Sequence, residues 1–114
     1  MRKGILIDVK NETIEFVLIE KGIQPIYDVV ECGTFEVVNI NDSNDIYVDE
    51  EGLLYLTNET KFFQFGEGRQ PIAGNGLILG YNQINGESID TNITIEEVKD
   101  KVKFLTLNQV RELV

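Results

Sequence analysis

The sequence predicts one α+β domain, residues 1–114, with a mostly antiparallel sheet built from hairpins and two or three short helices. Three observations lead to this prediction. Short β-rich runs are separated by polar turns, two capping-box sequences mark helix starts near the carboxyl end, and no repeat or linker divides the chain. A chain of 114 residues buries about two-thirds of its unfolded surface, which is enough for one core.

Two β-rich runs open the chain. Residues 3–9 and 13–20 flank a polar turn at 10–12, so they predict an amino-terminal hairpin. Residues 16–19 are apolar without a break, and apolar residues on both faces are typical of a strand inside a sheet. We therefore expect the second strand of this hairpin to be central.

The next segment predicts a short helix and then a second hairpin. Pro25 suits the first turn of a helix, and apolar side chains recur at helical spacing until Gly33, where we expect the helix to end. Residues 35–40 and 46–48 then predict two strands, which the turn formers at 41–45 connect.

The most apolar part of the chain lies in its middle. Residues 62–65 form an apolar block, and residues 72–79 carry no charge, so the second stretch must be buried if the protein is soluble. Its glycines let the backbone bend or approach another segment where a Cβ would clash. The Asn85-Gly86 pair predicts a hairpin turn, with residues 88–93 as the returning strand.

Capping boxes predict the last two helices. Thr94 and Thr106 each stand three residues before a Glu or Gln, which is the spacing of this motif. We expect Val98 and Val102 to face inward on the first helix, which residues 104–105 close. The second helix would be short and would end the chain.

The composition limits the classes of function that the protein can have. Twenty acidic and ten basic residues give a net charge of −10, which opposes direct binding to nucleic acid and to anionic membranes. The chain has no histidine and one cysteine, which removes the usual general base and the familiar zinc patterns. We therefore expect no enzyme activity, no cofactor and no metal. The lone Cys32 cannot form an internal disulfide, which fits a cytoplasmic location.

An acidic segment in the second hairpin is the first candidate site. Its charge would dock on a basic host protein, including a surface that normally binds nucleic acid; the competing interpretation is that the acids serve solubility alone. Tyr47 would be the aromatic anchor that such interfaces favour. The candidate partner-binding residues are Asp42, Asp45, Tyr47, Asp49, Glu50 and Glu51.

The glycine-rich stretch around Arg69 is the alternative site. It matches neither the dinucleotide fingerprint nor the P-loop, yet backbone N–H groups and one arginine can hold a phosphate. A nucleotide would then be bound by Arg69, Asn75, Gly76 and Tyr81, in a pocket that a homo-oligomer shares. The structural interpretation of these glycines is a strand bulge that passes close under a helix.

Several stretches together resemble one family. They are GILID (residues 4–8), IY (26–27), VDEEGLL (48–54), FF (62–63), QPIAGNGLILG (70–80) and TIEEV (94–98). The likeness is to small uncharacterised proteins of tailed phages, prophages and mobile elements; it extends to Phe104 and departs at residues 66–69. It implies a bacterial host cell as the setting, where small accessory phage proteins often antagonise host immunity by binding.

These observations give one leading hypothesis and two alternatives. The leading hypothesis is a non-enzymatic phage-type binding protein that antagonises a bacterial defence system through an acidic docking face. The alternatives are a sponge that sequesters a nucleotide immune signal and a phage accessory protein without a separable ligand.

Overall fold

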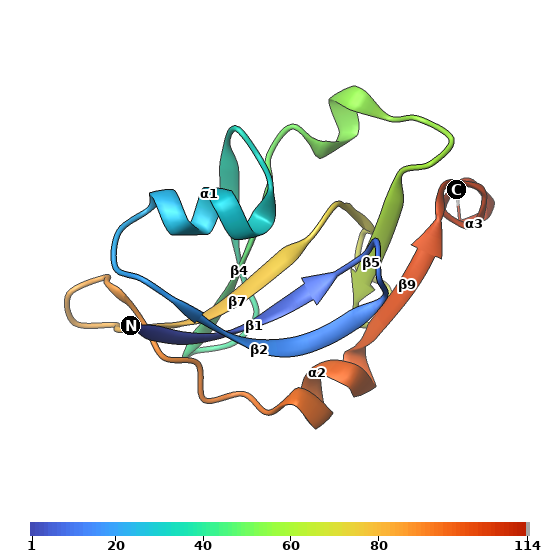
Figure 1. Cartoon of the computed structure of the whole chain (residues 1–114). Helices are drawn as coiled ribbons and strands as arrows, with labels where there is room; N and C mark the ends of the chain where they lie inside the picture. The colour runs from blue at the N-terminus through green and yellow to red at the C-terminus, as the bar shows by residue number, and fades with distance from the viewer. Residues whose placement is uncertain (114) are drawn as a thin grey trace.

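The computed structural model describes residues 1–113 as two antiparallel sheets and three short helices, which confirms the α+β prediction (Figure 1). The large sheet has the spatial order β2 (Thr13–Ile19), β1 (Arg2–Asp8), β7 (Gly76–Tyr81), β4 (Asn44–Asp49) and β3 (Phe35–Asn39), with β8 (Ser88–Ile89) paired to β7. The small sheet has the order β6 (Ile72–Ala73), β5 (Lys61–Phe65) and β9 (Val102–Thr106).

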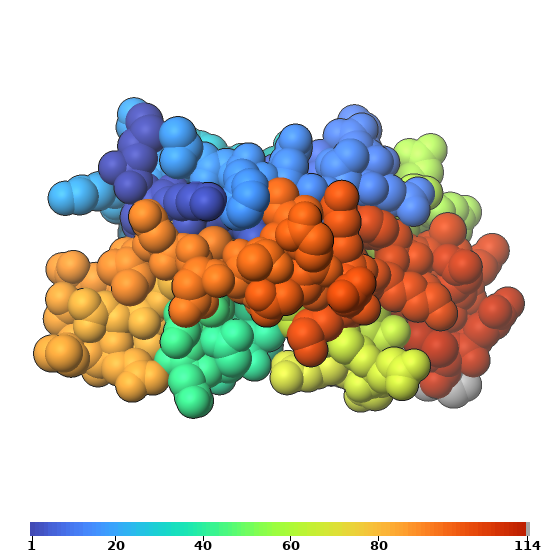
Figure 2. Space-filling model, turned by 90° about the horizontal axis from the view of Figure 1, so that it is seen from below, coloured from blue at the N-terminus to red at the C-terminus, as the bar shows by residue number. Residues whose placement is uncertain are grey.

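The helices and the small sheet cover the two faces of the large sheet. Helix α1 (Gln24–Val30) covers one face through Ile26 and Val30, which pack with Leu77 and Leu79. The small sheet and α2 (Ile95–Lys101) cover the other face, and α2 runs alongside β2 (Figure 2). Helix α3 (Leu107–Glu112) packs on the outer face of the small sheet, and a 3-10 helix, η1 (Gly52–Tyr55), follows β4.

Strand β7 lies at the centre of the core. It pairs with β1 along one edge and with β4 along the other, and only its last residue is exposed. Residues 75–79 are buried and Ile72 and Gly74 are partly buried, as their lack of charge predicted. Gly76 permits the close packing here, because a Cβ at this position would stand 2.7 Å from the Phe63 ring. The glycine therefore packs under an aromatic side chain of the small sheet, not under a helix.

The amino-terminal hairpin is confirmed, but the prediction that its second strand is central is wrong. Strand β2 lies at the edge of the large sheet, and β1 is the inner strand. The faces of β2 are apolar because a helix lies on each side of the sheet, and not because β2 has a strand along both edges: Val17 packs on the α1 side and Ile14 on the α2 side. Phe16 and Leu18 keep 45% and 69% of their surface exposed.

Helix α1 ends earlier than predicted. Its last residue is Val30, and Glu31 takes the left-handed conformation (φ 61°) that glycine usually supplies at this position. The Glu31 backbone N–H donates to the Tyr27 carbonyl and closes the last turn. Gly33 lies beyond the cap. The second hairpin, β3–β4, forms as predicted.

The capping threonines are confirmed, since the Thr94 and Thr106 hydroxyls accept the backbone N–H groups of Glu97 and Gln109. The extension of the first of these helices through Val102 is wrong. Residues 102–106 form strand β9, which pairs with β5. Their alternating apolar side chains meet a different layer on each face of the small sheet, which a helix would not permit. The returning strand predicted at 88–93 is only β8.

Replacing Gly76 with alanine tests the packing of β7. The new Cβ would meet the Phe63 ring and Ile46, so we expect Gly76→Ala to lower the free energy of unfolding by about 1–3 kcal/mol in urea titrations. Gly33→Ala is the matched control, because no atom lies within 4 Å of its added Cβ, and it should change stability by less than about 0.5 kcal/mol. Equal losses in the two variants would contradict the packing argument.

Candidate functional site

An open recess of about 560 Å³ runs along one side of α1, from its first residue to the residues just after its end, and the end of β4 and η1 bound the other side. We call it the acidic recess, because four of its nine lining residues are acids and none is a lysine or arginine. Two tyrosines stand among them. The lining residues are Gln24, Tyr27, Asp28, Glu31, Cys32, Gly33, Asp49, Glu51 and Tyr55.

A buried amide fixes the Glu31 side of the recess. The Asn75 side-chain N–H donates to the Glu31 carboxylate at 3.3 Å, and the Asn75 Oδ1 accepts the backbone N–H of Val9 at 3.1 Å. Asn75 is 8% exposed and directly precedes β7, so this carboxylate is tied to the most buried strand of the protein. The left-handed backbone of Glu31 costs about 1–2 kcal/mol for a residue with a Cβ. The recess therefore includes a strained, anchored acid.

Local hydrogen bonds position the acids on the opposite side. The Asp49 carboxylate accepts the backbone N–H of Glu51 at 2.9 Å, and the Glu51 carboxylate accepts the Thr34 hydroxyl at 3.1 Å. Cys32 lies between these acids and α1. Burial raises the pKa of its thiol, the nearby Asp49 charge raises it further, and a backbone hydrogen bond from Thr34 opposes both effects. Cys32 is therefore a poor nucleophile at neutral pH.

An exposed apolar segment borders the recess. Leu53, Leu54, Tyr55 and Leu56 are all exposed, and Tyr55 reaches 73% exposure. We call these four residues the apolar arm; they lie in and directly after η1, beyond the end of α1 (Figure 1). Its base is held against β6, because a Cβ on Gly52 would stand 2.8 Å from the Ala73 carbonyl oxygen. A contiguous exposed apolar surface beside charged groups is typical of an interaction site.

The structure divides the predicted acidic face into two parts. Asp49 and Glu51 line the acidic recess. Glu50 lies between them in sequence but lines only a neighbouring cavity, which Asp49 also lines. Asp45 lies at the other end of β4, about 13 Å from Asp49 along the strand at 3.3 Å per residue, and Asp42 lies in the turn before that strand. The Asp45 carboxylate there accepts the Asn39 amide at 3.1 Å.

Tyr47, the predicted anchor, is half-buried and lies outside the acidic recess. Its ring packs edge-on against Phe35 with centroids 5.3 Å apart, and Phe35 in turn contacts Tyr27 at 4.8 Å. The aromatic residues of the recess are Tyr27 and Tyr55, which sequence reasoning missed. Tyr27 and Glu31 stand four residues apart at the end of the predicted helix, and this spacing was the signal that could have placed both on one face.

The four residues of the predicted nucleotide site are not brought together. Asn75 is buried against Glu31 and Val9, Gly76 packs under Phe63, and Tyr81 lies at the far end of β7, about 17 Å along the strand from Gly76. Arg69 lines a different cavity.

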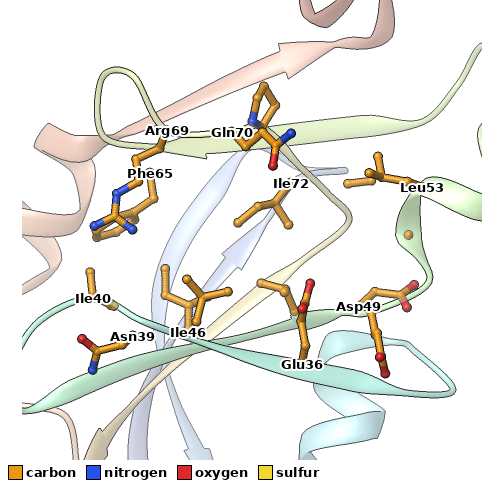
Figure 3. Close-up of a pocket in the computed structure, with 16 residues that line it drawn as sticks. Glu36, Asn39, Ile40, Ile46, Asp49, Leu53, Phe65, Arg69, Gln70 and Ile72 are labelled. Carbon is orange, nitrogen blue, oxygen red and sulfur yellow. The ribbon is translucent and has the colours of Figure 1, made fainter.

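That cavity has a volume of about 310 Å³ and lies between the β3–β4 hairpin and the small sheet (Figure 3). Its walls are mostly apolar, with Ile46 and Ile72 from the facing layers. Three acids, Glu36, Asp49 and Glu50, line it together with the single cation of Arg69. The charge in this cavity therefore opposes a polyphosphate ligand.

Residues 1–113 contain neither a metal-binding cluster nor a helix that could span a membrane. No group of three or more cysteine or acidic side chains in these residues is arranged to hold a metal ion, so the acids of the recess spread around it and do not converge on one point. Within the same residues, none of the helices has the length and apolar character that crossing a bilayer demands.

The Cys32 thiol provides a probe of the charge in the recess. Asp49→Asn removes the negative charge that raises the thiol pKa, so iodoacetamide should alkylate Cys32 faster in this variant at every pH below that pKa. Intact-mass spectrometry at several pH values measures the rate. Asp42→Asn, which removes a charge in the turn before β4, is the control and should leave the rate unchanged. Equal rates in the Asp49 variant and the parent would show that this charge does not act on Cys32.

Comparison with known proteins identifies a family. A family model described as "Domain of unknown function (DUF3846)" matches residues 1–103, which include every element from β1 to α2 and leave out α3. No curated protein and no solved structure matches the chain. Because the match covers nine-tenths of the 114 residues, the chain belongs to the DUF3846 family, an uncharacterised domain family.

Proposed function

We propose that this protein is a non-enzymatic binding protein that docks on a basic surface of a host protein through the acidic recess and the apolar arm. One observation carries the proposal: four carboxylates and two tyrosines surround one recess whose lining includes no lysine or arginine. A lysine or arginine of the partner would enter this recess, and the apolar arm would cover an apolar neighbour.

The physical chemistry of the recess suits a cationic side chain. A guanidinium group forms paired hydrogen bonds with carboxylates, and it also stacks on tyrosine rings such as Tyr27 and Tyr55. Tyrosine and arginine are the residues that contribute most to binding at many interfaces. The net charge of −10 would attract a basic partner at long range and raise the association rate.

The finer proposal concerns the biological setting. The resemblance to phage and prophage proteins favours a role in the cytoplasm of a bacterial host. Surfaces that bind nucleic acid are rich in lysine and arginine, so an acidic face that covers one would compete with the nucleic acid. We propose occlusion of this kind, directed at a protein of a bacterial defence system, as the way in which the protein acts.

The arrangement of charges favours docking over the nucleotide sponge. Arg69 lines its cavity together with three acids, and the other three residues of the predicted nucleotide site lie elsewhere. A nucleotide phosphate there would meet more negative than positive charge. The acidic recess has no comparable conflict with a basic ligand.

Charge reversal in the recess tests the proposal. We expect the double variant Asp28→Lys/Glu51→Lys to reduce the amount of basic host protein that co-purifies from a bacterial lysate by at least about tenfold, because it replaces two favourable ion pairs with repulsion. Quantitative mass spectrometry of the bound fraction measures this loss. Raising the salt concentration should weaken the interaction of the parent protein in the same direction.

A matched control separates the recess from overall charge. Asp42→Lys/Glu112→Lys changes the net charge equally, but both positions are exposed and lie outside the recess. This control should retain the partner, and thermal unfolding should show that both double variants remain folded. If the two double variants lose the partner equally, net charge alone explains the binding and the proposed site is wrong.

A further inference from the structure

Arg2 is a buried cation whose partners are all neutral. The side chain is 9% exposed, and its Nη1 donates to the Ser88 hydroxyl at 2.6 Å. Its Nη2 donates to the carbonyl oxygens of Gly22, at 2.7 Å, and Glu20. The Nε atom is buried without any hydrogen-bond partner. Arginine does not lose its proton in proteins, so a full positive charge stands here against neutral oxygen atoms.

The buried positive charge of Arg2 has no negative charge paired with it. Removing a charged group from water costs several kcal/mol, and an opposite charge normally offsets this cost. The nearby carbonyl and hydroxyl oxygens satisfy part of the hydrogen-bonding capacity of Arg2 but supply no negative charge. A ligand that brings an anionic group close to Arg2 would therefore be stabilised more here than at an exposed arginine.

Arg2 lines an open groove of about 1040 Å³, which we call the Arg2 groove. It lies between the start of α1, strands β3 and β4, and the β7–β8 hairpin. Its apolar surface is solvent-accessible, because Ile23, Val37 and Ile89 are each more than two-fifths exposed. The groove is separate from the acidic recess, since the two share no lining residue.

Two hydroxyl groups accompany Arg2 in the groove. Tyr47 and Ser88 both line it, and the Ser88 hydroxyl accepts a hydrogen bond from Arg2. Burial raises the pKa of the Tyr47 phenol and the Asp45 charge raises it further. Together they outweigh the lowering by Ser88 and Arg2, so the phenol keeps its proton at neutral pH. The groove therefore offers a buried positive charge and two O–H groups beside an apolar surface.

The charges at the rim indicate the class of ligand. Lys21 adds a second positive charge, but Glu87 and Asp90 line the same groove and offset Arg2 and Lys21. These acids leave the groove without the excess of positive charge that a polyphosphate requires, whereas a single carboxylate needs only one cation, Arg2, beside it. We propose that the Arg2 groove binds a small amphipathic monocarboxylic acid, with its carboxylate toward Arg2, Tyr47 and Ser88 and its apolar body on Ile23, Val37 and Ile89.

Three matched probes test this inference by NMR of the full chain labelled with ¹⁵N and ¹³C. The probes are 4-phenylbutyrate, its neutral amide 4-phenylbutanamide and the cation 4-phenylbutylamine. We expect 4-phenylbutyrate to shift the Arg2 Nε–H signal and the methyl signals of Ile23, Val37 and Ile89 with one saturable dissociation constant. The amide and the amine should bind at least about tenfold more weakly, because they cannot supply the missing negative charge.

Variants at Val37 keep the test independent of Arg2, whose replacement would remove its hydrogen bonds to Glu20, Gly22 and Ser88. Val37→Glu adds a negative charge to the exposed floor of the groove and should weaken binding of 4-phenylbutyrate by about tenfold. Val37→Lys loses the same apolar surface without adding a negative charge, so it should bind 4-phenylbutyrate more tightly than Val37→Glu does. The inference is overturned if the three probes bind equally, if 4-phenylbutyrate causes no saturable shift, or if the two Val37 variants bind it alike.

Discussion

The burial of β7 on both faces and along both edges is the constraint on which the rest of the structure depends. Leu77 and Leu79 pack toward α1, while Ile78 packs toward the small sheet and α2. Strands β1 and β4 occupy its edges. A strand in this environment requires cover on both sides, which is why two layers enclose the large sheet. Asn75, directly before β7, donates a hydrogen bond to the Glu31 carboxylate and so fixes its position in the acidic recess.

Both proposed sites lie on the face of the large sheet that α1 covers. This helix has only seven residues, so it covers part of the face and leaves the acidic recess along one of its sides and the Arg2 groove beside its start. A row of three aromatic rings, Tyr27, Phe35 and Tyr47, runs between the two sites. One site presents negative charge to a partner, and the other has a buried positive charge without an anion.

The elements that could be predicted from the sequence are those that interactions between residues close in sequence determine. The two hairpins and the threonine caps followed from turn chemistry and side-chain hydrogen bonds, which act within a few residues. The edge position of β2 and the strand at 102–106 were missed because both depend on partners far away in sequence. Only part of the acidic recess was predicted, for the same reason: Asp49 and Glu51 stand two residues apart in sequence, whereas Tyr27 and Glu31 reach them only through the fold.

Site-specific photo-crosslinking in bacterial cells that express the protein tests the central claim, which is that the acidic recess and the apolar arm contact a basic protein. Benzoylphenylalanine would replace Tyr55 in the arm or, as the control, Phe16, which is exposed on β2 toward the opposite face. The account predicts a light-dependent adduct with a basic protein from position 55 only, and its loss in the Asp28→Lys/Glu51→Lys background. The same adduct from both positions, or its persistence after charge reversal, would contradict the account.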